Sequence, residues 1–256
     1  MNGTGSYLDY RTEITPAMLR PALVDPCNQM NDKHRLLQRI QILGDRKSYT
    51  IEFCKGKKVL HIGCVDTGRF EQTDETLKDG RFLFLHSQIA KVAEYLVGID
   101  IDLKGVQWLK DAGYEAYRID IEHDQEPLWR ILKDVDTIIM PEVLEHLDNP
   151  GLALGNLRAS GFDGDILITT PNAFSRAVAI GIEQGVEIVH EDHNFWFSPT
   201  TLKSLLNKYG FQIKEMLLYF WPTDDPIGRE LREILPTKPY LAEGIIAIAN
   251  RNEGER

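Results

Sequence analysis

The stretch that decides the fold is "VLHIGCVDTG", residues 59–68, in which a short apolar run leads directly into a turn that contains Gly63. A glycine turn after a strand lets backbone N–H groups approach a ligand closely. Taken alone the signal is weak, because Gly63 would also suit an ordinary tight turn. Its meaning depends on the elements that follow it.

From residue 57 onward, short apolar runs alternate with amphipathic stretches, which predicts right-handed βαβ units and a mostly parallel sheet. The runs are "KKVLHI", "LVGIDI", "EAYRI", "VDTIIM" and "GDILIT"; helical candidates between them include "LHSQIAKVAEY" and "LKGVQWLKDAG", the second ended by Gly113. Later, "SPTTLKSLLNKYG" predicts a helix with Ser198 as cap, Pro199 in the first turn and Gly210 at the end. Two more strand candidates, "FQIKEMLLYF" and "AEGIIAIAN", follow it.

The N-terminal part differs from this pattern. Residues 1–30 contain three prolines and little periodicity, and they predict an irregular arm. Residues 32–43 place Leu36, Leu37, Ile40 and Leu43 at helical spacing. We therefore expect an α/β doubly wound domain over residues 51–256, preceded by an N-terminal arm and helical cap over residues 1–50.

The composition narrows the class of protein. The 256 residues are 43% hydrophobic and 27% charged, with a net charge of −10, which argues against a fold that grips phosphate backbones. The three cysteines, Cys27, Cys54 and Cys64, show no C-x-x-C spacing and favour a reducing compartment. We find no signal-peptide pattern and no apolar run of about 20 residues, the length of a membrane span, so we expect a cytoplasmic location and no membrane partner.

Acidic residues follow successive predicted strands, at the edge where such sheets bind ligands. Asp100 and Asp102 follow the second strand, where a carboxylate can accept both ribose hydroxyls of a nucleoside, and Asp120 follows the third, where it can meet an adenine amino group. Each carboxylate could instead only cap the next helix. Because all three features fall at successive strand ends, the nucleoside interpretation is favoured. The loop adds Asp66 and no P-loop lysine, which favours a cationic ligand over a phosphate.

The blocks "VLHIGCVDTG", "LVGIDID", "YRIDIE", "DTIIMPEVLEHL" and "GDILITTPN" resemble, in order and position, the class I S-adenosylmethionine-dependent methyltransferases over residues 57–249. The resemblance implies a Rossmann-like sheet of seven strands, the last antiparallel, and S-adenosyl-L-methionine as cofactor. The residues that it implies for cofactor binding are Gly63 at the methionine part, Asp100 at the ribose and Asp120 with Ile121 at the adenine, together with Cys64, Ile101 and Pro141.

This sequence departs from the pattern of the family at three places. His61 and Ile62 stand where an acidic residue usually precedes the first glycine, and Val65 stands where the second glycine is usual. Residues 68–85 are inserted before the first helix of the family pattern.

The stretch "MPEVLEHLDNP", residues 140–150, contains a candidate metal site. If a helix starts at Glu142, then Glu145 and His146 at i+3 and i+4 lie on the same face. Two carboxylates and an imidazole suit Mg, Mn, Fe or Co better than structural zinc, and His193 in "DHNFWFSP" is the candidate fourth ligand. The alternative is an ordinary helix start without metal, in which His146 or His193 acts as general base.

The same residues resemble the site of two families that use a metal: the small-RNA terminal 2′-O-methyltransferases and the ubiquinone-biosynthesis O-methyltransferases. That resemblance implies that Glu142, Glu145, His146 and His193 hold a metal that binds a vicinal diol. Close by, Phe195, Trp196 and Phe197 suit either a core cluster or stacking on a substrate. We expect His190 to be an ordinary loop histidine, and His86 and His123 to be surface groups.

The leading functional hypothesis is O-methylation of a small polyhydroxylated molecule, such as a sugar or glycan unit, a catechol or a natural product. Methylation of an RNA terminal ribose shares these motifs, but the net charge weighs against nucleic acid as partner. Metal-independent N- or C-methylation and a non-catalytic, cofactor-binding partner subunit are further alternatives.

Overall fold

The computed structural model describes residues 40–65, 84–221, 223–224 and 226–252. The predicted irregular arm, the first part of the predicted N-terminal helix and most of the insertion at 68–85 lie outside these residues. Among the helices described, none is both long enough and apolar enough to cross a membrane.

Within the described residues, eight strands form one sheet in the order β1-β7-β8-β6-β5-β2-β3-β4. Neighbours from β6 through β5, β2 and β3 to β4 are parallel, whereas β8 runs antiparallel to both β6 and β7. The strands are β1 (Gln41–Leu43), β2 (Lys58–Ile62), β3 (Tyr95–Asp100), β4 (Ala116–Arg118), β5 (Thr137–Pro141), β6 (Asp165–Pro171), β7 (Phe211–Tyr219) and β8 (Gly244–Arg251).

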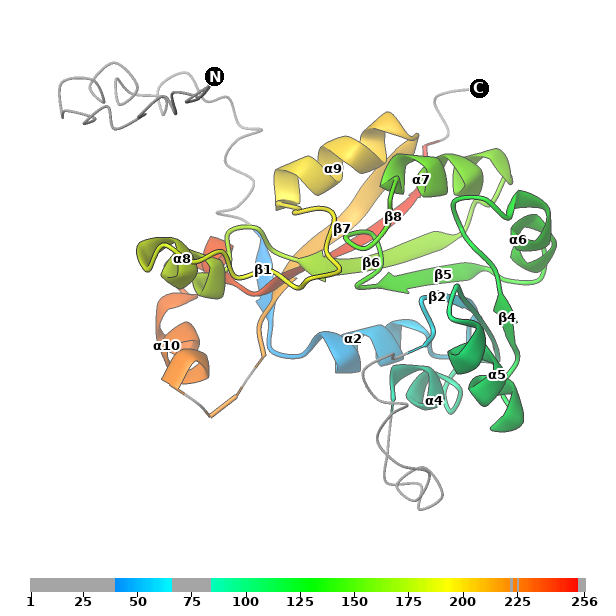
Figure 1. Ribbon diagram of the computed structural model, residues 1–256, viewed down its shortest axis with the longest axis horizontal. Helices are drawn as coiled ribbons and strands as arrows, with labels where there is room; N and C mark the ends of the chain where they lie inside the picture. Colours follow the sequence, from blue (N-terminus) through cyan, green and yellow to red (C-terminus); the bar gives the residue numbers. More distant parts are fainter. Residues whose placement is uncertain (1–39, 66–83, 222, 225, 253–256) are drawn as a thin grey trace, which may run out of the picture. The chain divides into compact units, whose positions relative to one another are not determined.

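Helices cover both faces of this sheet, with α2, α4 and α5 on one side and α6, α7 and α9 on the other (Figure 1). Two more helices, α8 and α10, lie together beyond the strands and are joined by an ion pair between Arg176 and Glu230 at 2.8 Å. The helices are α2 (Arg46–Phe53), α4 (Leu85–Ile89), α5 (Leu103–Asp111), α6 (Gln125–Leu132), α7 (Pro150–Ala159), α8 (Arg176–Glu183), α9 (Pro199–Lys208) and α10 (Pro226–Ile234), with a short 3₁₀ turn, η3 (Pro239–Leu241).

The seven predicted strands are all present, and the prediction of a last strand that is antiparallel is confirmed. The predicted count is one too low, because β1 forms where we expected helix. The helix prediction is wrong for residues 41–43, which pair in parallel with Leu217–Tyr219 of β7. An edge strand offers unpaired backbone groups, and this pairing overrides the helical spacing of the apolar side chains. The predicted boundary between residues 50 and 51 falls inside α2.

The helix ends follow the sequence signals closely. The hydroxyl of Ser198 caps α9 in a capping box with Thr201, and Pro199 occupies the first turn. Gly113 after α5 and Gly210 after α9 both have positive φ, 89° and 78°, as C-terminal stops require. The helix predicted from "LHSQIAKVAEY" is shorter than expected, because α4 ends at Ile89 and Tyr95 already belongs to β3.

The order of the strands reverses between β2 and β5, the two central strands. Leu60 of β2 and Ile138 and Ile139 of β5 are completely buried, so the sheet is rigidly packed at this point. In doubly wound sheets the ligand crevice lies at the carboxyl ends of the strands where the order reverses.

Candidate active site

A cavity of about 360 Å³ opens at the carboxyl ends of β2 and β5. Of the residues expected to bind the cofactor, Gly63, Cys64 and Pro141 line it. Cys64 is buried, and burial raises the pKa of its thiol, which therefore stays protonated and acts as a small apolar filler. The cavity is thus located where the sequence predicts the methionine part of the cofactor.

Gly63 is required by the backbone at the cavity wall. Its φ is 71°, and a Cβ atom at this position would lie 2.5 Å from Cγ2 of Val143. Any side chain here would clash and would also strain the backbone. Glycine at this position therefore lets the turn after β2 pack directly against Val143, in the segment that follows β5.

Asp100 lies at the end of β3, with one carboxylate oxygen accepting the N–H of Val65 at 2.9 Å and the other the N–H of Asp102 at 3.0 Å. Each oxygen keeps capacity for a further donor, such as a ribose hydroxyl. Burial raises the pKa of Asp100, although the two backbone donors oppose this effect. Beside it, the apolar side chain of Ile101 is 66% exposed, which suits packing against a planar ring.

Asp120 and Ile121, the two residues expected to contact the adenine, follow β4 and differ in what they offer: Asp120 offers a carboxylate, whereas Ile121 is buried. The carboxylate of Asp120 accepts the N–H of Glu122 at 2.8 Å and lies 3.0 Å from Nδ1 of His123. Burial opposes ionisation of Asp120, but these two partners outweigh it and lower its pKa. Ile121 is buried, and its carbonyl accepts an amide N–H of Asn156 at 2.9 Å. Together with Gly63, Asp100 and Ile101, these are the groups expected to bind the nucleoside part of the cofactor.

Two buried imidazoles line the same cavity, one of them unexpectedly. His86, which we expected at the surface, is 1% exposed, whereas His123 is exposed as expected. The Nδ1 atoms of His61 and His86 lie 3.1 Å apart, so one ring must donate and the other accept. Burial lowers the pKa of His86 to about 4 and that of His61 well below its ordinary value. The prediction for His86 was wrong because its ring points inward: it packs against the rings of Phe84 and Tyr114 and lies close to Gly98 of β3.

The residues after β5 form a turn, and the prediction of a helix start at Glu142 is wrong. Among the described residues, Glu142 is the one non-glycine with positive φ, 55°, and α7 begins only at Pro150. The Glu142 N–H bonds to the Thr169 carbonyl at 2.9 Å, which continues the pairing of β5 with β6 and prevents a helical start. Strained backbone of this kind is concentrated at functional sites.

The Glu142 side chain is held by a network that the sequence did not reveal. Its Oε1 atom accepts from Arg46 at 2.7 Å, from Thr169 at 2.8 Å and from Tyr219 at 3.1 Å. The guanidinium of Arg46 also lies over the ring of Trp221, 5.2 Å from its centroid. Arg46, Glu142 and Trp221 all line the cavity, so this network forms the wall next to the methionine end.

Three of the four predicted metal ligands come together in space. Glu145, His146 and His193 each place one ligand atom within 4.8 Å of the others. Glu142 is outside this group. The ring of His190, expected to be an ordinary loop histidine, lies 6.0 Å from that of His146 and 5.3 Å from that of His193. The sequence did contain a signal that His190 lies near the cluster, namely its i, i+3 spacing from His193.

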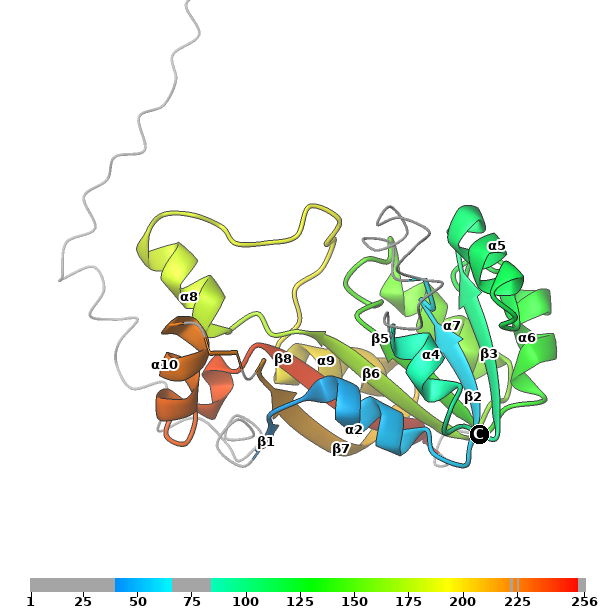
Figure 2. The same cartoon turned by 90° about the horizontal axis from the view of Figure 1, so that it is seen from below.

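The chain between α8 and α9 is fixed to this cluster by backbone bonds, and Figure 2 shows it as a long arch between the two helices. The carbonyl of Glu145 accepts the N–H groups of Asn194 at 2.7 Å and Phe195 at 3.1 Å. Nδ1 of His146 lies 3.1 Å from the Asp192 carbonyl, so it must carry the proton. Nε2 of His146 is therefore the nitrogen with a free lone pair, as a metal ligand requires.

Within the described residues, both carboxylate oxygens of Glu145, the nearby hydroxyl of Thr170 and Nδ1 of His193 are buried without a hydrogen bond of regular geometry. Burial, and then the nearby Glu142 carboxylate, raise the pKa of Glu145 to about 8. Burial and the neighbouring imidazoles of His146 and His190 lower the pKa of His193, which favours the neutral ring. Buried polar atoms are normally paired, so these orphaned atoms fit a divalent cation held between them.

Comparison with known proteins identifies the family of the chain. The family described as "Methyltransferase domain" matches residues 23–215, well over half of the chain. A comparison with curated proteins found no match.

Similar folds occur among solved methyltransferase structures. One, from Archaeoglobus fulgidus, is described as a SAM-dependent methyltransferase and is 18% identical, with 86% of this chain and 94% of that chain covered and a TM-score of 0.50. Magnesium protoporphyrin IX methyltransferase from Synechocystis PCC 6803 is 13% identical, with 92% and 94% covered and a TM-score of 0.52. The small RNA methyltransferase HEN1 is 19% identical with a TM-score of 0.51; 82% of this chain is covered, but only 25% of that one.

The family match covers β2 to β6 and the turn of Glu145 and His146, and the fold and cavity are those expected from the motifs. The chain therefore belongs to the class I S-adenosylmethionine-dependent methyltransferases, and S-adenosylmethionine is its cofactor.

Proposed function

We propose that the protein methylates a hydroxyl group of a small polyhydroxylated acceptor, with a divalent ion held by Glu145, His146 and His193. The observation that carries this proposal is the buried Glu145 carboxylate, which makes no hydrogen bond of regular geometry to a described residue and lies beside two imidazoles. An ion of the Mg, Mn, Fe or Co type would lower the pKa of a bound hydroxyl at neutral pH.

The other residues of the site would position the two reactants. The turn at Gly63 and the carboxylate of Asp100 orient the cofactor, while Arg46 and Tyr219 fix Glu142 in the wall between the cavity and the cluster. Alignment of the reacting atoms supplies a large part of the rate enhancement in such reactions. Glu142 remains a predicted fourth ligand, although its Oε1 atom is engaged by Arg46. Without a metal, His146 or His193 would serve as general base.

We propose a small molecule as acceptor because of the charge of the chain. Its net charge is −10. Nucleic-acid affinity depends on the release of counterions by basic side chains, and a chain this acidic offers few of them. We therefore favour a vicinal diol of a sugar, catechol or natural product over the terminal ribose of an RNA, which offers the same diol but is attached to a chain of phosphates.

The assignment of Asp100 predicts a loss of cofactor affinity. Asp100→Ala removes a carboxylate that would accept hydrogen bonds from the ribose, and we expect binding of S-adenosylmethionine to weaken by about 1–3 kcal/mol. Calorimetric titration measures this effect. Asp165→Ala, at the start of β6 and away from the cavity, is the matched control. An unchanged affinity in Asp100→Ala would refute the assignment.

The metal is tested by chelation. We expect chelator to abolish methyl transfer to a catechol while the affinity for S-adenosylmethionine stays close to its original value, because the cofactor residues Gly63, Asp100 and Asp120 lie outside the cluster, at the carboxyl ends of β2, β3 and β4. We also expect His193→Ala to lower the affinity for Mn²⁺ in calorimetry, and excess Mn²⁺ to restore part of its activity. Full activity of the metal-free protein in the presence of chelator would refute the metal, and the family assignment would stand.

A further inference from the structure

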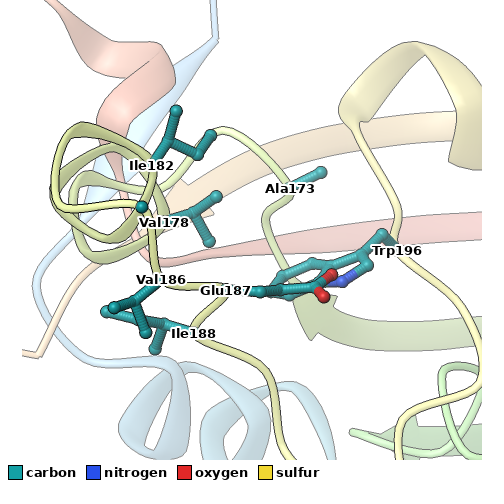
Figure 3. Close-up of a pocket in the computed structure, with 8 residues that line it drawn as sticks. Ala173, Val178, Ile182, Val186, Glu187, Ile188 and Trp196 are labelled. Atoms are coloured by element: carbon teal, nitrogen blue, oxygen red, sulfur yellow. The ribbon is translucent and has the colours of Figure 1, made fainter. Parts of the chain in front are cut away.

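A second cavity lies beside the cluster and has a different character. It has a volume of about 420 Å³ and is bounded by α8 and by the chain that follows it. In Figure 3, Val178 and Ile182 of α8 lie on one side, Val186 and Ile188 on another, and the ring of Trp196 forms a further wall. Among the lining residues Glu187 is the only charged one.

The apolar walls of this cavity are more exposed than such side chains usually are. Ile182 is 71% exposed, Val186 55% and Ile188 46%. The chain is anchored where it leaves α8, because the N–H of Val186 bonds to the Gly181 carbonyl at 2.8 Å. A concave group of exposed apolar residues is typical of a binding site, and the volume of this cavity is in the range of small-molecule pockets.

The cavity and the candidate metal cluster share one segment of chain. The ring of Trp196 lines the cavity and lies 6.3 Å from the ring of His193, at an interplanar angle of 88°. Two residues earlier, the N–H of Asn194 bonds to the Glu145 carbonyl. A molecule whose hydroxyls lie at the cluster can therefore extend past Trp196 into the cavity.

We propose that this cavity binds an uncharged apolar substituent of the acceptor, a short alkyl chain or a ring, and so sets the specificity of the reaction. The proposal rests on the proposed function, because it takes the cluster as the place of the acceptor hydroxyls. The carboxylate of Glu187 disfavours an anionic substituent. The substrate class is then a vicinal diol with an apolar group, rather than a free sugar.

The test uses the full-length protein and a series of 4-alkylcatechols whose alkyl group ranges from methyl to pentyl. Calorimetry measures their binding, and an activity assay measures kcat/KM for methyl transfer. We expect each methylene to raise affinity and kcat/KM about threefold to fourfold until the cavity is filled. Val178→Trp, which fills the cavity, should remove this gain. Ile182→Ser, at a position exposed enough to tolerate a polar residue, should reduce it. Leu152→Trp, at a partly exposed position on α7, should keep it.

The outcomes separate the two proposals. Turnover of catechol with no gain from the alkyl chain would overturn the substituent pocket and leave the proposed function intact. Binding that improves with chain length and is lost in Val178→Trp, but without turnover, would support the pocket and refute the proposed reaction. If Val178→Trp changes the oligomeric state by size-exclusion chromatography and leaves the alkyl gain unchanged, the cavity is an interface between copies and the proposal fails.

Discussion

Glu145→Leu is expected to abolish metal-dependent methyl transfer and, in metal-free protein, to raise the free energy of unfolding by about 1–3 kcal/mol. The two effects have one cause. Both carboxylate oxygens of Glu145 are buried without a hydrogen bond of regular geometry, which is costly in the absence of a cation. Leucine has a similar size and no polar atom to leave unpaired, but it cannot bind a metal.

Addition of metal should have the opposite effect on the difference in stability, because it should stabilise the original protein more than Glu145→Leu. A ligand that binds only the folded state stabilises it by about 3 kcal/mol at a concentration one hundred times its dissociation constant. We expect the original protein to gain this stability with Mn²⁺ and Glu145→Leu to gain much less. Urea denaturation with chelator and with Mn²⁺, followed by assay of methyl transfer, measures both effects.

The control for this experiment is Glu191→Leu, which removes an exposed carboxylate from the same loop as His193. We expect it to change neither the metal-free stability nor the gain with Mn²⁺ appreciably. If Glu145→Leu destabilises the metal-free protein and still gains stability from Mn²⁺, the buried carboxylate has a structural role and the cluster does not hold the metal.

The features that could be predicted from the sequence are those set by local patterns. The alternation of apolar runs and helices gave seven strands, and Ser198, Gly113 and Gly210 marked helix ends because caps and stops depend on neighbouring residues. The position of the cofactor cavity followed from one further rule, since parallel strands bring their carboxyl ends to the same edge.

The features that were missed depend on contacts between distant parts of the chain. β1 forms because the edge of β7 is available, more than 170 residues later. The positive φ of Glu142 accompanies its bonds to Thr169 and Arg46, and no local spacing indicates either of these. The site nevertheless assembled in part, because Glu145 and His146 are adjacent in the turn and the bonds of Asn194 bring His193 to them. Helical spacing was therefore the wrong reason for grouping Glu145 with His146.

The buried pair of His61 and His86 leads to the second large effect, which concerns pH. The pKa of His86 is lowered from 6.5 to about 4 by burial, and that of His61 is lowered in the same direction by burial and by His86. Because the folded state binds these protons less readily than the unfolded state, stability is complete above pH 6.5 and is lost as the pH falls toward 4. For His86 alone the loss amounts to about 3 kcal/mol.

The test compares the original protein with the double variant His61→Leu, His86→Phe. This variant removes both imidazoles together, so that neither is left without its hydrogen-bond partner. Urea denaturation between pH 7 and pH 4 should show that the original protein loses about 3 kcal/mol or more relative to the double variant. Carboxylates that titrate in this range affect both proteins alike, so the difference reports the imidazole pair.

The control is His123→Gln. The stability that His123 contributes changes with pH in the opposite direction from that of the buried pair. His123 is exposed, and its hydrogen bond to Asp120 raises its pKa. Any stability it contributes is present at low pH and is lost as the pH rises, so it cannot produce a loss on acidification. We therefore expect His123→Gln to keep the acid loss of the original protein. If the double variant keeps that loss as well, the two rings are not buried in the neutral form, and the packing of His61 and His86 around the cofactor cavity differs from that described.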